Sequence, residues 1–160
     1  MAEGPQAVKV YYPVRHLGLD VGDKLIGVAL SDETATLASG LETIRRVGPR
    51  KDLRAVVDIV REHGVVEVVV GLPRKLDGSL GPQAQKVIAF MEALRPAVKV
   101  PVVPWDERFT SVVANKALVE ADRSRKERKA LVDKVSAILI LQNYLDYRKL
   151  AEGEGRKSTA

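Results

Sequence analysis

Hydrophobic and polar positions alternate near the start of the chain, in the segment HLGLDVGDKLIGVALSD, residues 16–32. Every second residue from Leu17 to Val21 is a large apolar one, which is the period of a β-strand with one buried face. The polar turn GDK separates this segment from a second apolar run. The pattern predicts a β-hairpin from about Leu17 to Ser31, with Asp20 inside its first strand.

The spacing of apolar residues then changes to that of a helix. Residues 37–47 favour a third strand, which Pro49 ends. Over residues 52–63 the apolar positions recur at helical spacing, and Gly64 supplies a stop. This stretch therefore predicts the first helix.

Two more strands and a helix follow. The almost continuous apolar run VVEVVVGLP predicts a buried central strand that ends at Gly71. After a loop rich in glycine and proline, residues 83–95 predict a helix that Pro96 ends. The prolines of VPVVPW indicate an edge or end position for the next short strand.

The rest of the chain predicts helices. Thr110 and Ser111 can cap a helix that runs to about Ala121, and an apolar stripe predicts the last helix from about Leu131 to Leu150. Strands separated by helices imply one α/β domain over residues 15–150, with a mixed sheet covered on both faces. Residues 1–14 are expected to form an arm, and residues 151–160 a disordered tail.

Composition narrows the classes of protein that this domain can belong to. The 160 residues contain no cysteine, which excludes disulfides, thiolate metal ligands and a cysteine nucleophile and fits a reducing cytoplasm. No leader-like segment opens the chain, and no apolar run reaches the roughly 20 residues that span a bilayer. We therefore expect a cytoplasmic protein without a membrane partner.

The formal net charge of +5 permits nucleic-acid binding without requiring it. The basic residues gather in three places, and each cluster taken alone can also be a solvated face. They are Arg45, Arg46, Arg50, Lys51 and Arg54; Arg74 and Lys75; and Arg123, Arg125, Lys126, Arg128 and Lys129.

Three acidic residues occupy positions that would converge in such a fold. Asp20 lies in the first strand, Glu107 just after the last strand, and Asp133 near the start of the last helix. Magnesium fits a group of carboxylates, because it takes oxygen ligands. Each acid also has a structural explanation: Asp133 can cap its helix, and Glu107 can simply precede the next one. Asp20 is the hardest to explain so, because an unpaired carboxylate in a core strand is costly.

Four segments in this order, the hairpin, VVVGLPRKLDGSLGPQAQKV, DERFTS and VDKVSAILILQNYL, closely resemble the YqgF/RuvX family of Holliday-junction resolvases. The resemblance covers about residues 15–150 and implies an RNase H-like fold, a five-stranded mixed sheet flanked by helices. It also implies that Asp20, Glu107 and Asp133 are the catalytic acids. The chain departs from the family pattern at Asp23, Leu25 and Ser136, and the extra charge of Asp23 would weaken phosphate contact at the hairpin turn.

The resemblance further implies phosphodiester hydrolysis with two Mg²⁺ or Mn²⁺ ions about 4 Å apart, held by the three acids. The substrate would be branched DNA, the precursor of small-subunit rRNA, or both, and symmetric cleavage of a junction would need a homodimer. Basic residues would hold the phosphates. We expect this of Lys24, Arg45, Arg46, Arg74, Lys75, Arg108, Arg123, Arg125 and Lys126.

Two other classes of function have to be weighed. The hairpin also resembles the first phosphate loop of sugar kinases, actin and heat-shock ATPases, but those chains need a duplicated half that these 160 residues do not contain. The second alternative is a ribosome-maturation factor that binds nucleic acid with little or no cleavage. A complete set of acids favours the nuclease.

Overall fold

The computed structural model describes residues 13–109 and 125–157, with side chains over 13–108 and 134–153. A five-stranded sheet forms its centre, in the order β3-β2-β1-β4-β5. β2 pairs antiparallel with β1 and with β3, whereas β4 runs parallel to β1 and to β5. The strands are β1 (Arg15–Val21), β2 (Leu25–Ser31), β3 (Ala38–Arg45), β4 (Val65–Leu72) and β5 (Val102–Asp106).

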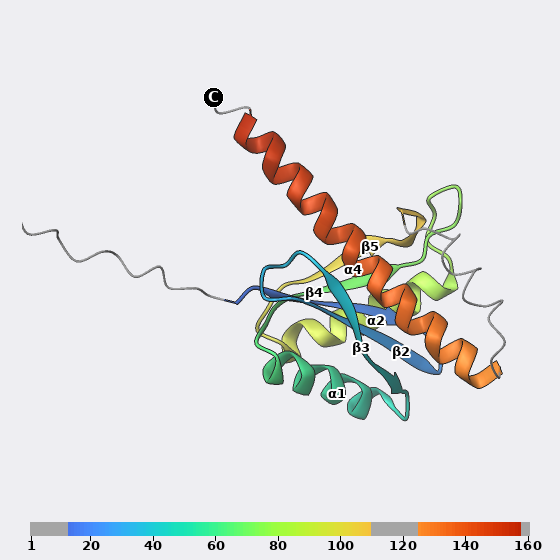
Figure 1. Ribbon diagram of the computed structural model, residues 1–160. Helices are drawn as coiled ribbons and strands as arrows, with labels where there is room; N and C mark the ends of the chain where they lie inside the picture. Colours follow the sequence, from blue (N-terminus) through green and yellow to red (C-terminus); the bar gives the residue numbers. More distant parts are fainter. Residues whose placement is uncertain (1–12, 110–124, 158–160) are drawn as a thin grey trace, which may run out of the picture.

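Helices cover both faces of this sheet, as the sequence predicts (Figure 1). One face packs on α1 (Pro49–Glu62) and α2 (Pro82–Ala97), and the other on the long helix α4 (Arg125–Lys157). A short 3₁₀ helix, η1 (Glu107–Phe109), directly follows β5. None of the helices in the described part of the chain is long and apolar enough to cross a membrane.

The two-residue period of the strands divides the core into two layers. Leu17, Leu19 and Val68 belong to the layer beneath α1 and α2, while Val69 of β4 packs with Leu141 of α4. Successive side chains of β1 and β4 therefore point to opposite faces of the sheet, one covered by α1 and α2 and the other by α4. The face of β1 that α4 covers carries His16, Gly18 and Asp20.

Two glycines allow α4 to lie directly on the middle of the sheet. A Cβ added to Gly18 would lie 2.7 Å from the Leu141 Cβ and 3.0 Å from the Ala137 carbonyl oxygen. A Cβ on Gly71 would collide with the Ile140 side chain. Because no side chain stands between backbone and helix here, the distance from sheet to helix is fixed.

The bounds of α1 and α2 differ from those that the sequence predicts. α1 begins three residues early, because Pro49 is suited to the first turn and the Asp52 N–H donates to the Gly48 carbonyl. α2 continues through Pro96, since a proline φ is helical and a lost hydrogen bond in the last turn is tolerable. The helix predicted over 110–121 and most of the N-terminal arm lie outside the described residues.

The last helix is longer than predicted at both ends. It begins at Arg125 instead of Leu131 and ends at Lys157 instead of Leu150. Residues 151–157, expected to be disordered, are therefore helical. Their alanine, glutamates, arginine and lysine are good helix formers, and they offset the two glycines.

Candidate active site

The carboxyl ends of the three parallel strands meet at one edge of the sheet. Asp20 is the next-to-last residue of β1, Gly71 holds the same position in β4, and Glu107 comes directly after β5. This edge is where ligands bind in open α/β sheets. Asp20 and Glu107 lie at the same edge because β1, β4 and β5 are parallel neighbours in the sheet.

The side chains of Asp20 and Glu107 are in contact across β4. The Glu107 carboxyl group forms a hydrogen bond with Asp20. Gly71 makes room for it, since a Cβ there would lie 2.7 Å from Glu107 Oε1. Two carboxyl groups in contact can both be charged only if a cation lies between them, and otherwise they share a proton.

The surroundings of Glu107 disfavour its charge. Burial raises the pKa of the Glu107 carboxyl, the hydrogen bond with Asp20 opposes this rise, and the negative charge of Asp106 adds to it. A carboxylate whose charge is disfavoured by its surroundings gains most from a bound cation. The pair therefore has the chemistry of a metal-binding site.

Asp133 lies in α4, and its side chain is not among those described. α4 runs antiparallel to β1, because His16 packs near Tyr144, whereas Gly18 meets Ala137 and Leu141. Asp133 is one helical turn before Ala137, in the direction in which β1 continues to Asp20. Among the side chains that the structure describes, no three of His, Cys, Asp or Glu form a group that could hold a metal ion.

Several predicted phosphate-binding residues lie at this same edge. Lys24 is exposed in the turn after β1, and Arg45 is exposed at the end of β3, opposite Leu25. Arg74 and Lys75 are exposed in the loop after β4. Arg108 is the residue after Glu107, and its guanidinium is bound to Asp106. The structure thus brings five of the nine predicted residues to the edge that carries the acids.

The Arg46 side chain, expected to hold a phosphate, makes its contacts within the fold. Its guanidinium donates to Asp52 Oδ2 at 3.1 Å and to the Gly22 carbonyl at 2.9 Å, and it lies over the Phe90 ring. These contacts tie the hairpin turn to the start of α1. The structure thus gives Arg46 a role inside the fold, where the sequence suggested a phosphate contact.

Asp52, the partner of Arg46, is a buried residue that sequence reasoning passed over. Burial favours its neutral form. Hydrogen bonds from the Val47 N–H, the Arg46 guanidinium and the Gly48 N–H outweigh burial and hold the pKa of Asp52 below its ordinary value. The sequence signal that could have identified Asp52 is its position in the first turn of a predicted helix, where an acid is often a cap.

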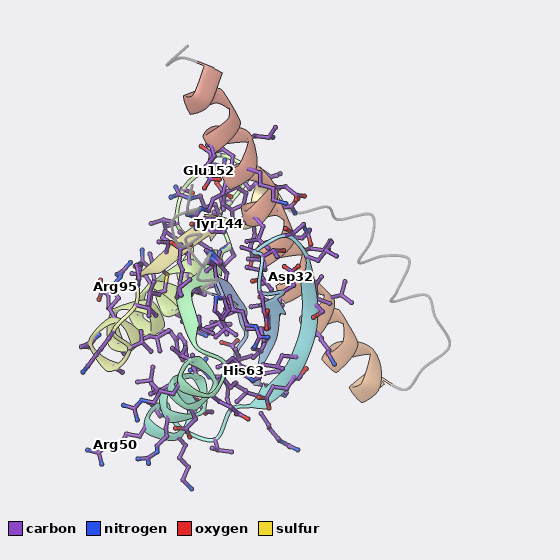
Figure 2. All side chains as sticks on the ribbon, turned by 60° about the vertical axis from the view of Figure 1, so that its left-hand side comes forward. Asp32, Arg50, His63, Arg95, Tyr144 and Glu152 are labelled. Carbon is purple, nitrogen blue, oxygen red and sulfur yellow. The ribbon has the colours of Figure 1, made fainter. Side chains whose placement is uncertain are left out.

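The remaining basic residues are not placed at the site. Arg123 lies outside the described residues, and Arg125 and Lys126 begin α4 with undescribed side chains. Arg50 lies on α1, on the other side of the molecule from Tyr144 of α4 (Figure 2). Arg50 is therefore remote from that half of α4.

A buried polar cluster fastens α4 to the opposite end of β1 and β4. His16 Nδ1 lies 3.1 Å from Glu67 Oε1, and the Tyr144 hydroxyl donates to the same oxygen. Burial, helped by the bond to Glu67, raises the pKa of Tyr144 to about 12. Arg148 Nη1 lies 3.4 Å from His16 Nε2. Since arginine can only donate, His16 accepts at Nε2 and carries its proton on Nδ1.

A mixed five-stranded sheet in the order β3-β2-β1-β4-β5, covered by helices on both faces, defines a protein of the RNase H-like fold class. Solved structures share this fold. RuvC of T. thermophilus in complex with a Holliday junction has a TM-score of 0.59 at 16% identity, covering 86% of this chain and 96% of that one. The fowlpox virus Holliday junction resolvase has a TM-score of 0.52 at 14% identity, covering 84% and 99%.

Sequence comparison then identifies the family. Residues 14–147 match RuvX, described as Holliday junction resolvase, and the chain belongs to this family. A relative from Thermoanaerobacter pseudethanolicus is 51% identical over 137 residues, covering 85% of this chain and 99% of that protein. One from Moorella thermoacetica is 53% identical over 133 residues, covering 83% and 95%. Both are provisionally named pre-16S rRNA nucleases, and together with the family match these names make the chain a hydrolase of the nuclease type.

Proposed function

We propose that this chain is a metal-dependent endonuclease that cleaves phosphodiester bonds in structured nucleic acid, either four-way DNA junctions or the precursor of small-subunit rRNA. The observation that carries the proposal is the contact between the Asp20 and Glu107 carboxyl groups at the ends of β1 and β5. Such a pair has little structural use at a sheet edge, and a divalent cation is its natural counterion.

Asp20, Glu107 and Asp133 would hold Mg²⁺ or Mn²⁺, as one or two ions. The antiparallel course of α4 along β1 supports the third ligand, because Asp133 lies one helical turn before the turn that meets Gly18, in the direction of Asp20. When bound, the metal would supply a nucleophilic water and stabilise the charge of the leaving oxygen. Gly71 keeps the space beside Glu107 clear, so that the carboxylate can turn toward a ligand.

The basic residues around this edge would bind the phosphates of the substrate. Lys24, Arg45 and Arg108 are near the acids, and Arg74 and Lys75 line the loop after β4. For Arg123, Arg125 and Lys126 the proposal depends on the sequence alone. Contacts with phosphates position a duplex without reading its sequence, which suits an enzyme that recognises the shape of its substrate.

The names of the relatives favour RNA as the substrate, and the titles of the structural neighbours favour a DNA junction. Cleavage of a junction on two strands would require a two-fold homodimer on the DNA. Either activity would place the enzyme in the cytoplasm. The competing proposal is a ribosome-maturation factor that binds precursor rRNA without cutting it.

A cleavage assay on both substrates tests the proposal. The purified chain is incubated with a four-way DNA junction and with a structured precursor-rRNA fragment, in Mg²⁺, in Mn²⁺ and in EDTA. Cleavage that needs the metal and falls at least about 10²-fold in Asp20→Asn is the expected result. Glu42→Gln, an equal change of charge on β3, is the control and should keep its activity.

Each outcome of this assay has a distinct meaning. If both substrates are bound but neither is cut, the nuclease proposal fails and the maturation factor replaces it. If only RNA is cut, the junction is not the substrate. Light scattering on a bound junction checks the dimer, which a single copy per junction would contradict.

A further inference from the structure

Asp106 lies at the centre of a cluster of charged side chains immediately before Glu107. Its Oδ2 accepts hydrogen bonds from Arg108 Nη2 at 2.6 Å and Nε at 2.9 Å, and its Oδ1 accepts from the Arg108 backbone N–H at 3.0 Å. Arg74 Nε lies 3.6 Å from the same Oδ2. One carboxylate thus holds two guanidinium groups, one from the loop after β4 and one from η1.

The loop that carries Arg74 is tightly hydrogen-bonded. The Arg74 guanidinium donates to the Gly78 carbonyl at 3.1 Å, and the Lys75 N–H donates to the Ser79 carbonyl at 3.0 Å. Asp77 accepts from both the N–H and the hydroxyl of Ser79. Gly78 has a φ of 86°, and a Cβ on it would lie 3.3 Å from Arg108 Nη1. The loop is therefore folded against Arg108.

The two ends of these ion pairs differ in their contact with solvent. The Asp106 side chain is 15% exposed, whereas those of Arg74 and Arg108 are 36% and 37% exposed. Each guanidinium carries five N–H donors in a rigid fork, so an arginine that binds a carboxylate on one edge still presents donors on the other. The aspartate lies inside the cluster, and both arginines reach the surface beside Glu107.

We propose that Asp106 is a positioning residue that holds Arg74 and Arg108 as a paired guanidinium clamp for one backbone phosphate next to the scissile bond. The inference rests on the proposed function, because it takes Glu107 as a catalytic acid. Since Asp106 and Arg108 flank Glu107 in the chain, the clamp keeps a fixed distance from that acid. Holding both side chains in place lowers the entropy lost when the phosphate binds.

A purely structural ion pair makes the opposite prediction about binding. If Asp106 only closes the loop, Asp106→Asn removes a negative charge beside a polyanion and should strengthen binding. If Asp106 positions the clamp, the same change releases both arginines and weakens binding. The sign of the change in affinity therefore separates the two roles.

Fluorescence anisotropy in EDTA measures binding without cleavage, with the labelled four-way junction and the labelled precursor-rRNA fragment as probes. We expect Asp106→Asn to raise Kd about three- to tenfold and to lower the slope of log Kd against log salt by about one. Arg108→Lys, which keeps the charge but loses the fork, should raise Kd by a similar factor.

Asp23→Asn is the matched control for charge. Asp23 is an exposed acid of the hairpin turn, paired with Lys86 of α2 at 3.1 Å. Its substitution makes the same change in net charge without touching the arginines, so Kd should stay the same or fall.

An unchanged or lower Kd for Asp106→Asn, or for Arg108→Lys, would overturn the clamp, as would a wild-type chain that binds neither probe. Urea unfolding checks that the variants are folded. If Asp106→Asn does not fold, the Kd of Arg108→Lys alone tests the clamp. The nuclease proposal can fail independently of the clamp. A wild-type chain that binds through the clamp but never cuts would support the clamp and contradict the nuclease proposal.

Discussion

Arg46 and Arg108 each bind an aspartate, and the burial of that aspartate separates their roles. Asp52 is 2% exposed, so Arg46 neutralises a charge inside the fold and is held there. Asp106 is 15% exposed, and Arg108, at 37%, remains at the surface next to Glu107. In the sequence both arginines are simply basic residues near the predicted site. Burial depends on contacts between distant segments, which a local pattern cannot show.

His16 gives the stability of the protein a dependence on pH. Burial, reinforced by Arg148 and partly offset by Glu67, holds the pKa of His16 below its ordinary value. The folded protein then keeps His16 neutral, while the unfolded chain takes up a proton near pH 6.5. Because the unfolded state binds more protons below that pH, the free energy of unfolding should fall as the pH drops from about 6.5 toward the lower pKa of the folded state.

Urea unfolding at pH 7.5, 6.5 and 5.5 measures this effect. His16→Asn, which retains a donor for Glu67, should lose most of the decrease. His63→Gln removes the only other histidine and should keep it. Equal pH dependence in wild type and His16→Asn would show that His16 does not cause it.

At the scale of elements, the contact of α4 with β1 and β4 brings the proposed site together. The apolar stripe of this helix could be predicted from the sequence, and Ala137 and Leu141 are indeed buried. The sequence also placed Asp20 and Glu107 at converging positions. The close approach at Gly18 and Gly71 could not be predicted, because a glycine in a strand is equally compatible with a nearby phosphate.

Gly18→Ala should push α4 away from the sheet. The new methyl group would lie 2.7 Å from the Leu141 Cβ, and the rigid helix backbone leaves it no room. We expect a loss of about 1–3 kcal/mol in the free energy of unfolding, measured by urea denaturation. A loss of cleavage activity larger than the loss of folded protein would follow from displacement of Asp133.

Gly153→Ala is the control for this substitution. Gly153 lies in the same helix with open space around it, so alanine should be neutral or stabilise the protein by up to about 1 kcal/mol. If Gly18→Ala were as stable as the wild type, the close packing of α4 on β1 would be wrong.

At the scale of the whole molecule, α4 extends beyond the sheet, and its C-terminal end projects from the domain (Figure 1). Tyr147 and Leu150 are exposed there, although the Tyr147 ring lies 5.5 Å from that of Trp105. The buried part of the helix ends at Leu145. The sequence predicts this helix to about Leu150, and the helix continues to Lys157 because helical propensity does not require burial.

The projecting end should therefore contribute little to the stability of the domain. Deleting residues 151–160 is expected to change the free energy of unfolding by no more than about 1 kcal/mol, since residues 151–153 are exposed. Ending the chain at residue 143 also removes Leu145 and the Tyr144 bond to Glu67, and should cost at least about 3 kcal/mol. Chemical denaturation of the two shortened chains, followed by circular dichroism, distinguishes these values. A large loss from the shorter deletion would mean that the projecting end packs on the domain.

Because α4 lies at the end of the chain, it can dock on the sheet only late in synthesis. The bonds that fasten this helix join residues far apart in the chain, from Tyr144 to Glu67, from Gln142 to Ala38 and from Arg148 to His16. On the ribosome the five strands emerge first, and the face of β1 with Asp20 stays uncovered until the last fifth of the chain has been made. A nascent chain would hold Asp20 and Glu107 without the helix that carries Asp133. The proposed site would therefore be complete only when synthesis of the chain is nearly finished.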